Sequence, residues 1–366
     1  MIRDEKDPNS LQESVSLNIP KKKGESAIQL LTKLKLLGGK LAPQTIDDVL
    51  HVPLSRAPKL EERKQLDRAL GKQSLSQEKF PSRSQTIGSL EQVLARQLPS
   101  SVIQLVSKSF DVIGDIAIIE LSPTTQPFEK SIAEALMKVH KNVKTVYSKA
   151  GPITDNLRLR PLHHLFGTDR TETIHKELGC RFKIDISRAF FSPRLSAEHK
   201  RVAEQVRPGE CVVDMFAGVG PFSILIAKRL NDVQVHAIDA NPEATKLIRE
   251  NAKMNKVQDR IKVWSGDARK VVQDNLYGIA TRVIMNHPSQ AREFLDSACQ
   301  ALRHGGGIVH FYTFAEGLDS ESSARKELAA SLDNPDWKVE TIETHKVRGV
   351  APMKWQIAVD AKLTPA

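Results

Sequence analysis

Apolar and polar stretches alternate regularly over residues 181–366. Short β-type apolar runs are followed by helical patterns that begin at Pro221, at Pro242, near Gln290 and near Ser320. The runs are ECVVDMFAG, VQVHAIDA, IKVWSGDA, RVIMNHP, GGGIVHFYTF, WKVETIETHKV and WQIAVDAKL. This alternation predicts an α/β domain, a mostly parallel seven-stranded Rossmann-like sheet with helices on both faces. No helical pattern separates the last two runs, which predicts an antiparallel hairpin at one sheet edge.

Two smaller α+β patterns precede this domain. Within residues 1–54, VSLNIP and VLHVPL flank a helical segment with Ile28, Leu31 and Leu34 on one face. Residues 87–180 contain apolar runs around the turn IGD and a helical FEKSIAEALMKVH segment. The intervening residues 55–86 are charged and punctuated by Pro and Ser, which predicts a linker with at most a short helix.

Composition narrows the class of protein. The 366 residues carry 54 Lys and Arg against 44 Asp and Glu, a net charge of +10 that favours a polyanionic partner without proving one. The three cysteines, Cys180, Cys211 and Cys299, lie far apart, which argues against a disulfide framework and fits a reducing compartment. The polar N-terminus and the absence of a long apolar run predict a soluble, cytoplasmic protein that does not span a membrane.

A nucleoside-binding pattern follows the first strand of the large domain. In DMFAGVGPF, Phe216, Gly218 and Gly220 lie at the strand end and in the turn, and glycines there let a ligand approach the backbone. Asp239 and Ala240 end the next strand, about 20 residues later, where a carboxylate accepts hydrogen bonds from ribose hydroxyls. The turn lacks the third glycine of GxGxxG, which disfavours a dinucleotide and leaves S-adenosylmethionine as the preferred cofactor.

The third and fourth strand ends support this choice. Asp267 and Ala268 follow the third strand, where a carboxylate can recognise an adenine amino group. Asn286-His287-Pro288 ends the fourth, with an amide that can donate to and accept from a planar base and a proline that stiffens the corner. Four strand ends in this order predict an S-adenosylmethionine-dependent methyltransferase.

Further candidates lie upstream, in AFFSPRLSAEHKRV. Glu198 begins a helix beside the cofactor strand, and a carboxylate in a partly dry pocket there would have a raised pKa and serve as a base. An ordinary helix N-terminal acid is the competing interpretation of Glu198, and core packing is that of Phe190 and Phe191. Arg158 and Arg160 could contact phosphate or an oxyanion, although solvated charges are the default.

Histidines do not indicate a metal site. His163, His164 and His175 have no carboxylate or cysteine at a ligand spacing, and we expect no metal. For His287, between Asn286 and Pro288, the sequence likewise indicates neither a general base nor a metal ligand.

Together these segments resemble the archaeal and eukaryotic tRNA guanine-37 N1-methyltransferase family over nearly the whole chain. LNIPKKKGESAIQLLTKLKLL is similar to its small tRNA-elbow domain and FDVIGDIAIIE to its middle RNA-binding domain. RFKIDISRAFFSPRLSAEHKRV and DMFAGVGPFSI are similar to its catalytic domain, residues 181–366. The resemblance implies a monomer that binds tRNA at the anticodon loop and the elbow and methylates N1 of guanosine 37.

The resemblance also implies roles for individual residues. Arg158 would stabilise the guanine O6 oxyanion, Glu198 would remove the N1 proton, and Asn286 would hold the base edge. His199, Asp239, Ala240, Asp267, Ala268 and Asn286 would surround the cofactor, and Phe190, Arg194 and Pro288 the substrate. The chain departs from the usual family pattern at His287, Phe190 and Val350, positions that bear on base stacking and substrate range.

Three other functions remain open on the sequence. A related branch transfers the aminocarboxypropyl group of the same cofactor, but it typically lacks the Asn-x-Pro corner that Asn286 and Pro288 form here. Some archaeal members methylate a tricyclic guanine derivative at position 37. A tRNA-binding protein without activity is the non-enzyme alternative.

Overall fold

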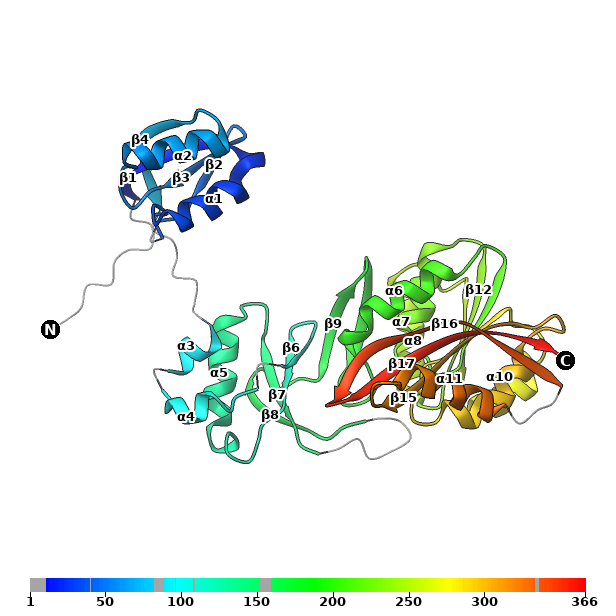
Figure 1. Ribbon diagram of the computed structural model, residues 1–366. Helices are drawn as coiled ribbons and strands as arrows, with labels where there is room; N and C mark the ends of the chain where they lie inside the picture. The colour runs from blue at the N-terminus through cyan, green and yellow to red at the C-terminus, as the bar shows by residue number, and fades with distance from the viewer. Residues whose placement is uncertain are drawn as a thin grey trace. The chain divides into compact units, whose positions relative to one another are not determined.

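The computed structural model describes residues 11–39, 41–81, 89–95, 97–107, 109–151, 159–332 and 336–366. The chain divides into two compact units, Met1–Ser89 and Leu90–Ala366, coloured blue and cyan to red in Figure 1. Among the described residues, no helix combines the length and the apolar content needed to cross a membrane.

Unit 1 is a four-stranded antiparallel sheet with two helices. Its elements are β1 (Leu11–Pro20), a 3₁₀ turn (Lys21–Lys23), α1 (Gly24–Lys33), β2 (Gln44–Ile46), β3 (Val49–Pro53), α2 (Leu60–Leu70) and β4 (Ser74–Pro81), in the sheet order β2-β3-β1-β4. The buried face of α1 runs through Gly24, Ala27 and Leu31, whereas Ile28 is exposed. The prediction that Ile28 lies on the buried face was therefore wrong. The buried position is the preceding residue, Ala27, because the small residues Gly24 and Ala27 allow the helix to approach the sheet closely.

The expected linker, residues 55–86, is largely part of this fold. Its charged helix α2 buries Leu66 and Leu70 in the core of the unit. Its strand β4 pairs along the length of β1, with Phe80 fully buried. The short helix allowed for this segment corresponds to α2, whereas the charged composition concealed β4, because an edge strand buries only one side.

Unit 2 begins with a small α/β sheet. Its elements are α3 (Leu90–Leu94), α4 (Ser100–Ile103), β5 (Asp111–Ile113), β6 (Ile116–Ile119), a 3₁₀ turn (Gln126–Phe128), α5 (Glu129–Val139), β7 (Thr145–Lys149) and β8 (Leu162–Gly167), in the sheet order β5-β6-β7-β8. A tight turn at Gly114-Asp115 joins β5 to β6, as the IGD pattern predicts. α5 then crosses over to the parallel strand β7.

A hairpin that the sequence did not predict connects this sheet to the large one. β9 (Glu172–Glu177) pairs with β10 (Cys180–Asp185) through the two-residue turn Leu178-Gly179, where both residues have positive φ. Such a turn matches the twist of the two strands. Its second strand carries Phe182 and Ile184 into the core of the catalytic domain.

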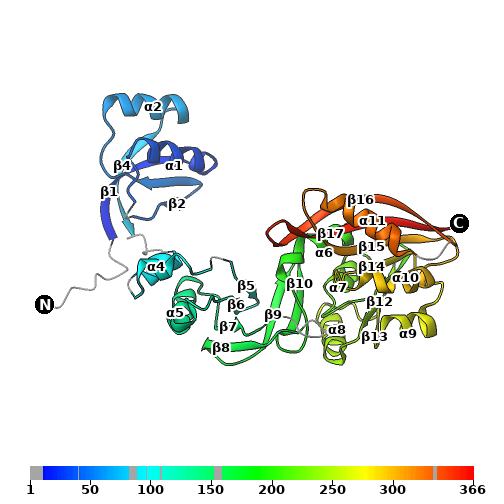
Figure 2. The same ribbon diagram turned by 60° about the horizontal axis from the view of Figure 1, so that its bottom comes forward.

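The large sheet is seven-stranded, as predicted, in the order β13-β12-β11-β14-β15-β17-β16 (Figure 2). The strands are β11 (Glu210–Asp214), β12 (Val233–Asp239), β13 (Ile261–Ser265), β14 (Arg282–Met285), β15 (Gly307–Glu316), β16 (Trp337–Ala351) and β17 (Lys354–Pro365). The first five are parallel, and β16 and β17 form the predicted antiparallel hairpin at one edge.

Helices cover both faces of this sheet. They are α6 (Ser196–Gln205) after a 3₁₀ turn (Pro193–Leu195), α7 (Pro221–Arg229), α8 (Pro242–Met254), α9 (Ala268–Val271) with a π turn (Val272–Leu276), a 3₁₀ turn (Ala291–Phe294), α10 (Leu295–Ala301) and α11 (Ser320–Ser331). Val212 packs with α6, α7 and α8, while its neighbour Val213 packs with α9, α10 and α11. Alternate strand residues thus supply two cores, and the carboxyl ends of the parallel strands stay open for a site.

Candidate functional site

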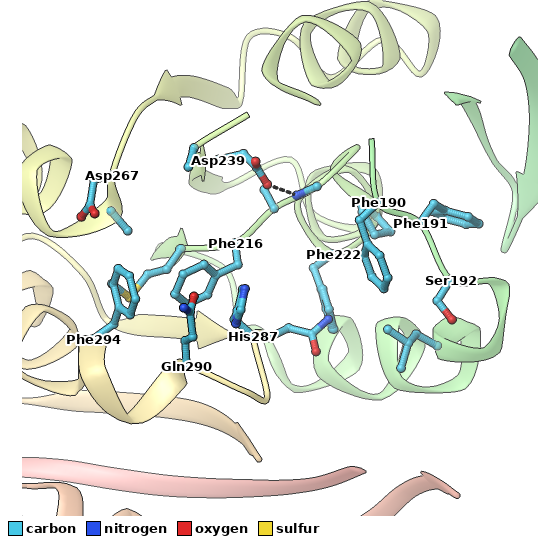
Figure 3. A pocket seen from close by; sticks show the side chains of 18 of the residues that line it. Phe190, Phe191, Ser192, Phe216, Phe222, Asp239, Asp267, His287, Gln290 and Phe294 are labelled. Atoms are coloured by element: carbon cyan, nitrogen blue, oxygen red, sulfur yellow. Dashed lines mark hydrogen bonds between the residues drawn. The ribbon is translucent and has the colours of Figure 1, made fainter. Parts of the chain in front are cut away.

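A cavity of about 250 Å³ lies at the carboxyl ends of β11, β12, β13 and β14. It is lined by Phe190, Phe191, Ser192, Leu195, His199, Met215, Phe216, Ala217, Gly218, Pro221, Phe222, Asp239, Ala240, Gly266, Asp267, Ala268, Arg269, Asn286, His287, Gln290, Glu293 and Phe294. Asp267 and Phe294 lie at one end and Phe190 and Ser192 at the other, with Phe216 and His287 between them (Figure 3). We call it the cofactor cavity.

The glycine turn forms one wall of the cofactor cavity. Gly218 has φ +57° and Gly220 φ +88°, in the left-handed region that glycine adopts without strain. A Cβ atom on Gly218 would lie 3.1 Å from the carbonyl oxygen of Phe190. Pro221 starts α7 directly after the turn, where its missing N–H breaks no helical hydrogen bond. Gly220 itself shapes this turn without lining the cavity.

Asp239 is held at the mouth of the same turn. Its carboxylate accepts hydrogen bonds from the backbone N–H groups of Gly218 at 2.7 Å and Asn241 at 2.9 Å. The first of these is the dashed line in Figure 3. Burial raises the pKa of Asp239 to about 6, although the two backbone donors lower it. A fixed, ionised carboxylate next to a glycine turn can accept from the hydroxyls of a ribose.

The opposite end of the cofactor cavity is aromatic. The rings of Phe216 and Phe294 meet edge to face with centroids 4.9 Å apart, and the Arg269 guanidinium lies 4.6 Å from the Phe294 centroid. Asp267 caps α9 and pairs with Arg269, which lowers the pKa of its carboxyl. Aromatic faces beside an ionised acceptor suit a planar base with an amino group, such as adenine.

Asp214 is a buried acid that the sequence reasoning did not select. It ends β11 with no exposed surface, and its Oδ2 accepts a hydrogen bond of 2.8 Å from the Ser223 hydroxyl. Burial raises the pKa of Asp214 to about 7, and the negative charge of Asp239 adds to this effect. Its place as the first residue of DMFAGVGPF, at the end of the strand that leads to the glycine turn, was the available signal.

The Asn286-His287-Pro288 corner contributes its first two residues to the cofactor cavity. The Asn286 Oδ1 accepts a hydrogen bond of 3.1 Å from the amide of Gln356 on β17. The buried His287 ring packs 5.1 Å from that of Phe216. Pro288 is buried behind the corner and does not line the cavity. Within the described part of the chain, no cluster of three or more His, Cys, Asp or Glu residues is arranged to hold a metal.

A second cavity, of about 310 Å³, adjoins the first between the small sheet and the catalytic domain. It shares Phe190, Phe191 and Ser192 with the cofactor cavity. Its lining also includes Asp111, Ile113, Ile118, Lys149, Leu159, Arg160, Leu162, Ile184, Ile186, Ala189, Arg194, Phe314, Arg348, Gly349 and Val350. We call it the basic cavity because three arginines and a lysine line it.

The arginines of the basic cavity come from three different segments. Arg194, predicted to contact substrate, pairs with Asp111 at 2.6 Å. Arg348 on β16 is partly buried, and burial together with the nearby charge of Arg194 lowers the pKa of its guanidinium. Arg158, the predicted oxyanion-stabilising residue, lies outside the described residues, but Arg160, two positions later, lines the basic cavity.

Glu198 differs from its expected environment. It is 4% exposed, lines neither cavity, and accepts hydrogen bonds from Arg201, Tyr312 and His345. Burial raises its pKa, but these donors outweigh burial, and the net pKa is about 2. The expected raised pKa was therefore wrong, because strands β15 and β16 supply partners more than 100 residues away.

His199, one residue further, does line the cofactor cavity. Its ring is buried, lies edge to face on Phe222 with centroids 4.6 Å apart, and places Nδ1 2.7 Å from a carboxylate oxygen of Glu177 on β9. The connecting hairpin thus fixes the orientation of a cavity residue. The sequence had singled out His199 but not Glu177.

Comparison with known proteins assigns both parts of unit 2 to families. Residues 173–339 match the TRM5/TYW2 methyltransferase domain, and residues 90–171 match the TYW2 N-terminal domain. The tRNA (guanine(37)-N(1))-methyltransferase Trm5b of Pyrococcus abyssi is 38% identical over 296 residues, covering 78% of this chain and 87% of the relative. The crystal structure of that Trm5b superposes with a TM-score of 0.72 at 34% identity, covering 96% of this chain and 99% of the other.

A relative with a different reaction is also similar. The tRNA(Phe) (4-demethylwyosine(37)-C(7)) aminocarboxypropyltransferase of Pyrococcus horikoshii is 31% identical over 274 residues. The match covers 75% of this chain and 96% of that relative. Both relatives are named for nucleotide 37 of tRNA.

Proposed function

The chain belongs to the TRM5/TYW2 methyltransferase family, and we propose that it transfers the methyl group of S-adenosylmethionine to N1 of guanosine 37 in tRNA. The observation that carries this proposal is the pair of adjoining cavities. One has the features of an adenosine site, the other is lined by arginines, and they meet at Phe190, Phe191 and Ser192.

The residues of the cofactor cavity fit the adenosine part of S-adenosylmethionine. Phe216, Phe294 and Asp267 suit the adenine, and Asp239 suits the ribose hydroxyls. An S-adenosylmethionine placed in this way would have its sulfonium end toward Phe190 and Ser192, which the two cavities share. When bound, S-adenosylmethionine supplies an electrophilic methyl group, and the protein's task is to present a nucleophilic nitrogen to it.

The basic cavity suits a base flipped out of an RNA chain. Phe190 and Phe191 offer faces for stacking, and Arg160, Arg194 and Arg348 offer donors for phosphate or for a negatively charged oxygen. Removing the proton from guanine N1 places negative charge on O6. Donors directed at O6 therefore lower the cost of making N1 a nucleophile. The family resemblance assigns this role to Arg158. Among the described residues, Arg160 and Arg348 line the basic cavity and offer donors of the same kind.

The base role of Glu198 requires a change of partners. Burial alone raises the pKa of this carboxyl, and only the donors Arg201, Tyr312 and His345 hold it near 2. Loss of one of these donors would therefore raise the pKa of Glu198 toward that of an effective proton acceptor, and the freed carboxylate oxygen would then take the N1 proton of guanine. His345, on the partly exposed strand β16, is the partner best placed to leave.

Transfer of the aminocarboxypropyl group is the second candidate function. It is favoured by the match of residues 90–171 to the TYW2 N-terminal domain and by the similar aminocarboxypropyltransferase. The Asn286-Pro288 corner, which that branch typically lacks, favours methyl transfer. Methylation of a tricyclic guanine derivative would use the same cavities.

One experiment separates these functions. The protein is incubated with labelled S-adenosylmethionine and tRNA transcripts that carry guanosine or another base at position 37, and nucleoside 37 is weighed by mass spectrometry. We expect the mass of one methyl group on guanosine alone. Equal labelling of all transcripts would refute the assignment to position 37, and the larger adduct would establish aminocarboxypropyl transfer.

A further inference from the structure

A chain of three side chains links the two cavities. Asn286 lines the cofactor cavity, Arg348 lines the basic cavity, and Gln356 lies between them with 1% of its surface exposed. The Arg348 Nε donates to the Gln356 Oε1 at 2.9 Å, and the Gln356 Nε2 donates to the Asn286 Oδ1 at 3.1 Å. We call this chain the amide relay.

The fold places the relay residues in one row. Arg348 on β16 is directly opposite Gln356 on β17, so the two side chains project from the same face of the sheet. Irregularities in the pairing flank Arg348 on both sides, between Lys346 and Arg348 and again between Gly349 and Ala351. Such bulges redirect side chains, and here they bring the guanidinium to both Gln356 and the Ser192 hydroxyl.

The direction of each hydrogen bond follows from the chemistry of Arg348. A guanidinium only donates, so the oxygen of the Gln356 amide must face it. The Gln356 nitrogen then faces Asn286, and a nitrogen that donates requires the Asn286 oxygen opposite it. The Asn286 NH₂ group is therefore the part of this amide left for a ligand of the cavity.

We infer that Gln356 and Arg348 are positioning residues that lock Asn286 as a hydrogen-bond donor, so that the site accepts a base with an oxygen at position 6 and rejects one with an amino group there. This inference rests on the proposed function. A donor meets guanine O6, whose charge grows as N1 loses its proton, and it opposes the amino group of adenine. Asn286 alone, free to rotate its amide, would accept either base.

Reversing the relay is the sharpest test. Gln356→Glu replaces the amide with a carboxylate that pairs with Arg348 but only accepts, so Asn286 must turn its NH₂ group toward residue 356 and its oxygen toward the base. Gln356→Met, of similar length, removes both hydrogen bonds without reversing Asn286. The full-length variants are compared with the wild type at equal cofactor saturation.

We expect Gln356→Glu to lower kcat on guanosine-37 tRNA by about 100-fold, the usual effect of losing one donor to a developing oxyanion, and Gln356→Met by less. The deficit of Gln356→Glu should shrink as the pH rises, because solvent then helps to remove the N1 proton. In equilibrium binding, the preference for guanosine-37 over adenosine-37 transcripts should fall at least ten-fold for Gln356→Glu.

Two results would overturn the inference. One is a base preference of Gln356→Glu within two-fold of the wild type. The other is equal loss of kcat by Gln356→Glu and Gln356→Met at every pH, which is what a purely structural role predicts. Failure of the proposed function gives a different result, because the wild type would then transfer no group to guanosine 37. The binding preference for guanosine-37 over adenosine-37 tRNA would still show whether the amide relay orients Asn286.

Discussion

At the scale of the residue, three buried carboxylates near the cofactor cavity differ in pKa because their partners differ. Burial dominates at Asp214 and the like charge of Asp239 adds to it, so its pKa is about 7 despite the Ser223 hydroxyl and the Phe216 backbone donor. Asp239 has two backbone donors and a pKa of about 6. Glu198 has an ion pair and two further donors, which bring its pKa to about 2. The protonation state of each carboxyl group thus depends more on its hydrogen-bonding and ionic partners than on how deeply it is buried.

Asp214→Asn should stabilise the protein at neutral and alkaline pH. The folded-state pKa of Asp214 is raised above its unfolded value, so the ionised group costs stability once the pH exceeds about 4. This cost grows up to about pH 7 and is on the order of 2–4 kcal/mol above it. Urea unfolding should show a higher free energy of unfolding for Asp214→Asn at pH 8 and no difference at pH 4. The exposed Asp259→Asn is the matched control, and equal curves at pH 8 would contradict the buried charge.

Glu198→Gln should lower turnover by roughly 10²-fold or more, the usual loss with a general base. It should also lower the free energy of unfolding by on the order of 2 kcal/mol near neutral pH, because Arg201 loses its ion pair with Glu198 and keeps Asp360 and the more distant Glu343, at 3.7 Å. That stability difference should vanish as the pH falls from about 4.5 toward 2, where the wild-type carboxyl also takes up its proton.

Glu204→Gln, on the same helix but exposed and 3.8 Å from Lys200, controls for loss of charge on α6. Single-turnover rates are measured well below the unfolding temperature, and cofactor affinity by calorimetry. A Glu198→Gln variant that keeps its rate while losing stability would make Glu198 an anchor of strands β15 and β16 and exclude it as the base.

The sequence revealed those site residues whose position relative to a predicted strand is fixed by the local sequence. Asp239, Asp267 and Asn286 were found because each follows a strand, and parallel strands end at one sheet edge. Gln356 and Arg348 were missed because they lie on an edge hairpin, far along the chain from Asn286. The pKa of Glu198 was mispredicted for the same reason, since its partners Tyr312 and His345 are remote in sequence.

At the scale of the element, Asn251 on α8 and Asn255, directly after its last residue, hold the connecting hairpin against the catalytic domain. Asn251 accepts from the backbone N–H of Lys183 and donates to its carbonyl, and Asn255 does the same with Arg181. They lie one helical turn apart and both are buried. Their side chains thus replace a neighbouring strand along the free edge of β10.

Asn251→Ala should loosen this hairpin. It leaves a backbone donor and a backbone acceptor of β10 without their partner, at a cost of about 2–3 kcal/mol. Hydrogen exchange at the Lys183 amide should quicken by about 30-fold or more, since 2 kcal/mol corresponds to that factor. Lys253→Ala, exposed on the same helix, should leave this exchange unchanged. Equal protection in both variants would show that the Asn251 bonds do not hold the edge.

Element prediction succeeded where both sides of an element are buried. The parallel strands read as continuous apolar runs, and the final hairpin followed from the missing helix. Prediction failed for β4, β9 and β10, whose one-sided burial leaves many polar residues. The hydrogen bonds of Asn251 and Asn255 to β10 could not be predicted either, because their partners lie about 70 residues away in the sequence.

At the scale of the whole molecule, charge and division into units bear on RNA binding. The net charge of +10 does not say which unit meets a polyanion. In unit 1, Lys21 and Lys22 are exposed at the turn before α1, and in unit 2 arginines line the basic cavity. The described residues that line the cofactor cavity all belong to unit 2. The two units therefore carry separable tasks if both contact tRNA.

Removing unit 1 should weaken tRNA binding and leave cofactor binding intact. Each phosphate contact releases counterions and contributes about −0.7 to −0.9 to the slope of log affinity against log salt concentration. Residues 90–366 should therefore bind tRNA more weakly and with a shallower slope than the full chain, and Lys21→Ala with Lys22→Ala should reproduce about one to two units of that change. Calorimetry with S-adenosylmethionine verifies that the shortened protein is folded, since the cofactor cavity lies wholly within it. An unchanged slope together with intact cofactor binding would confine the phosphate contacts to unit 2, because an exposed lysine that meets no phosphate releases no counterion.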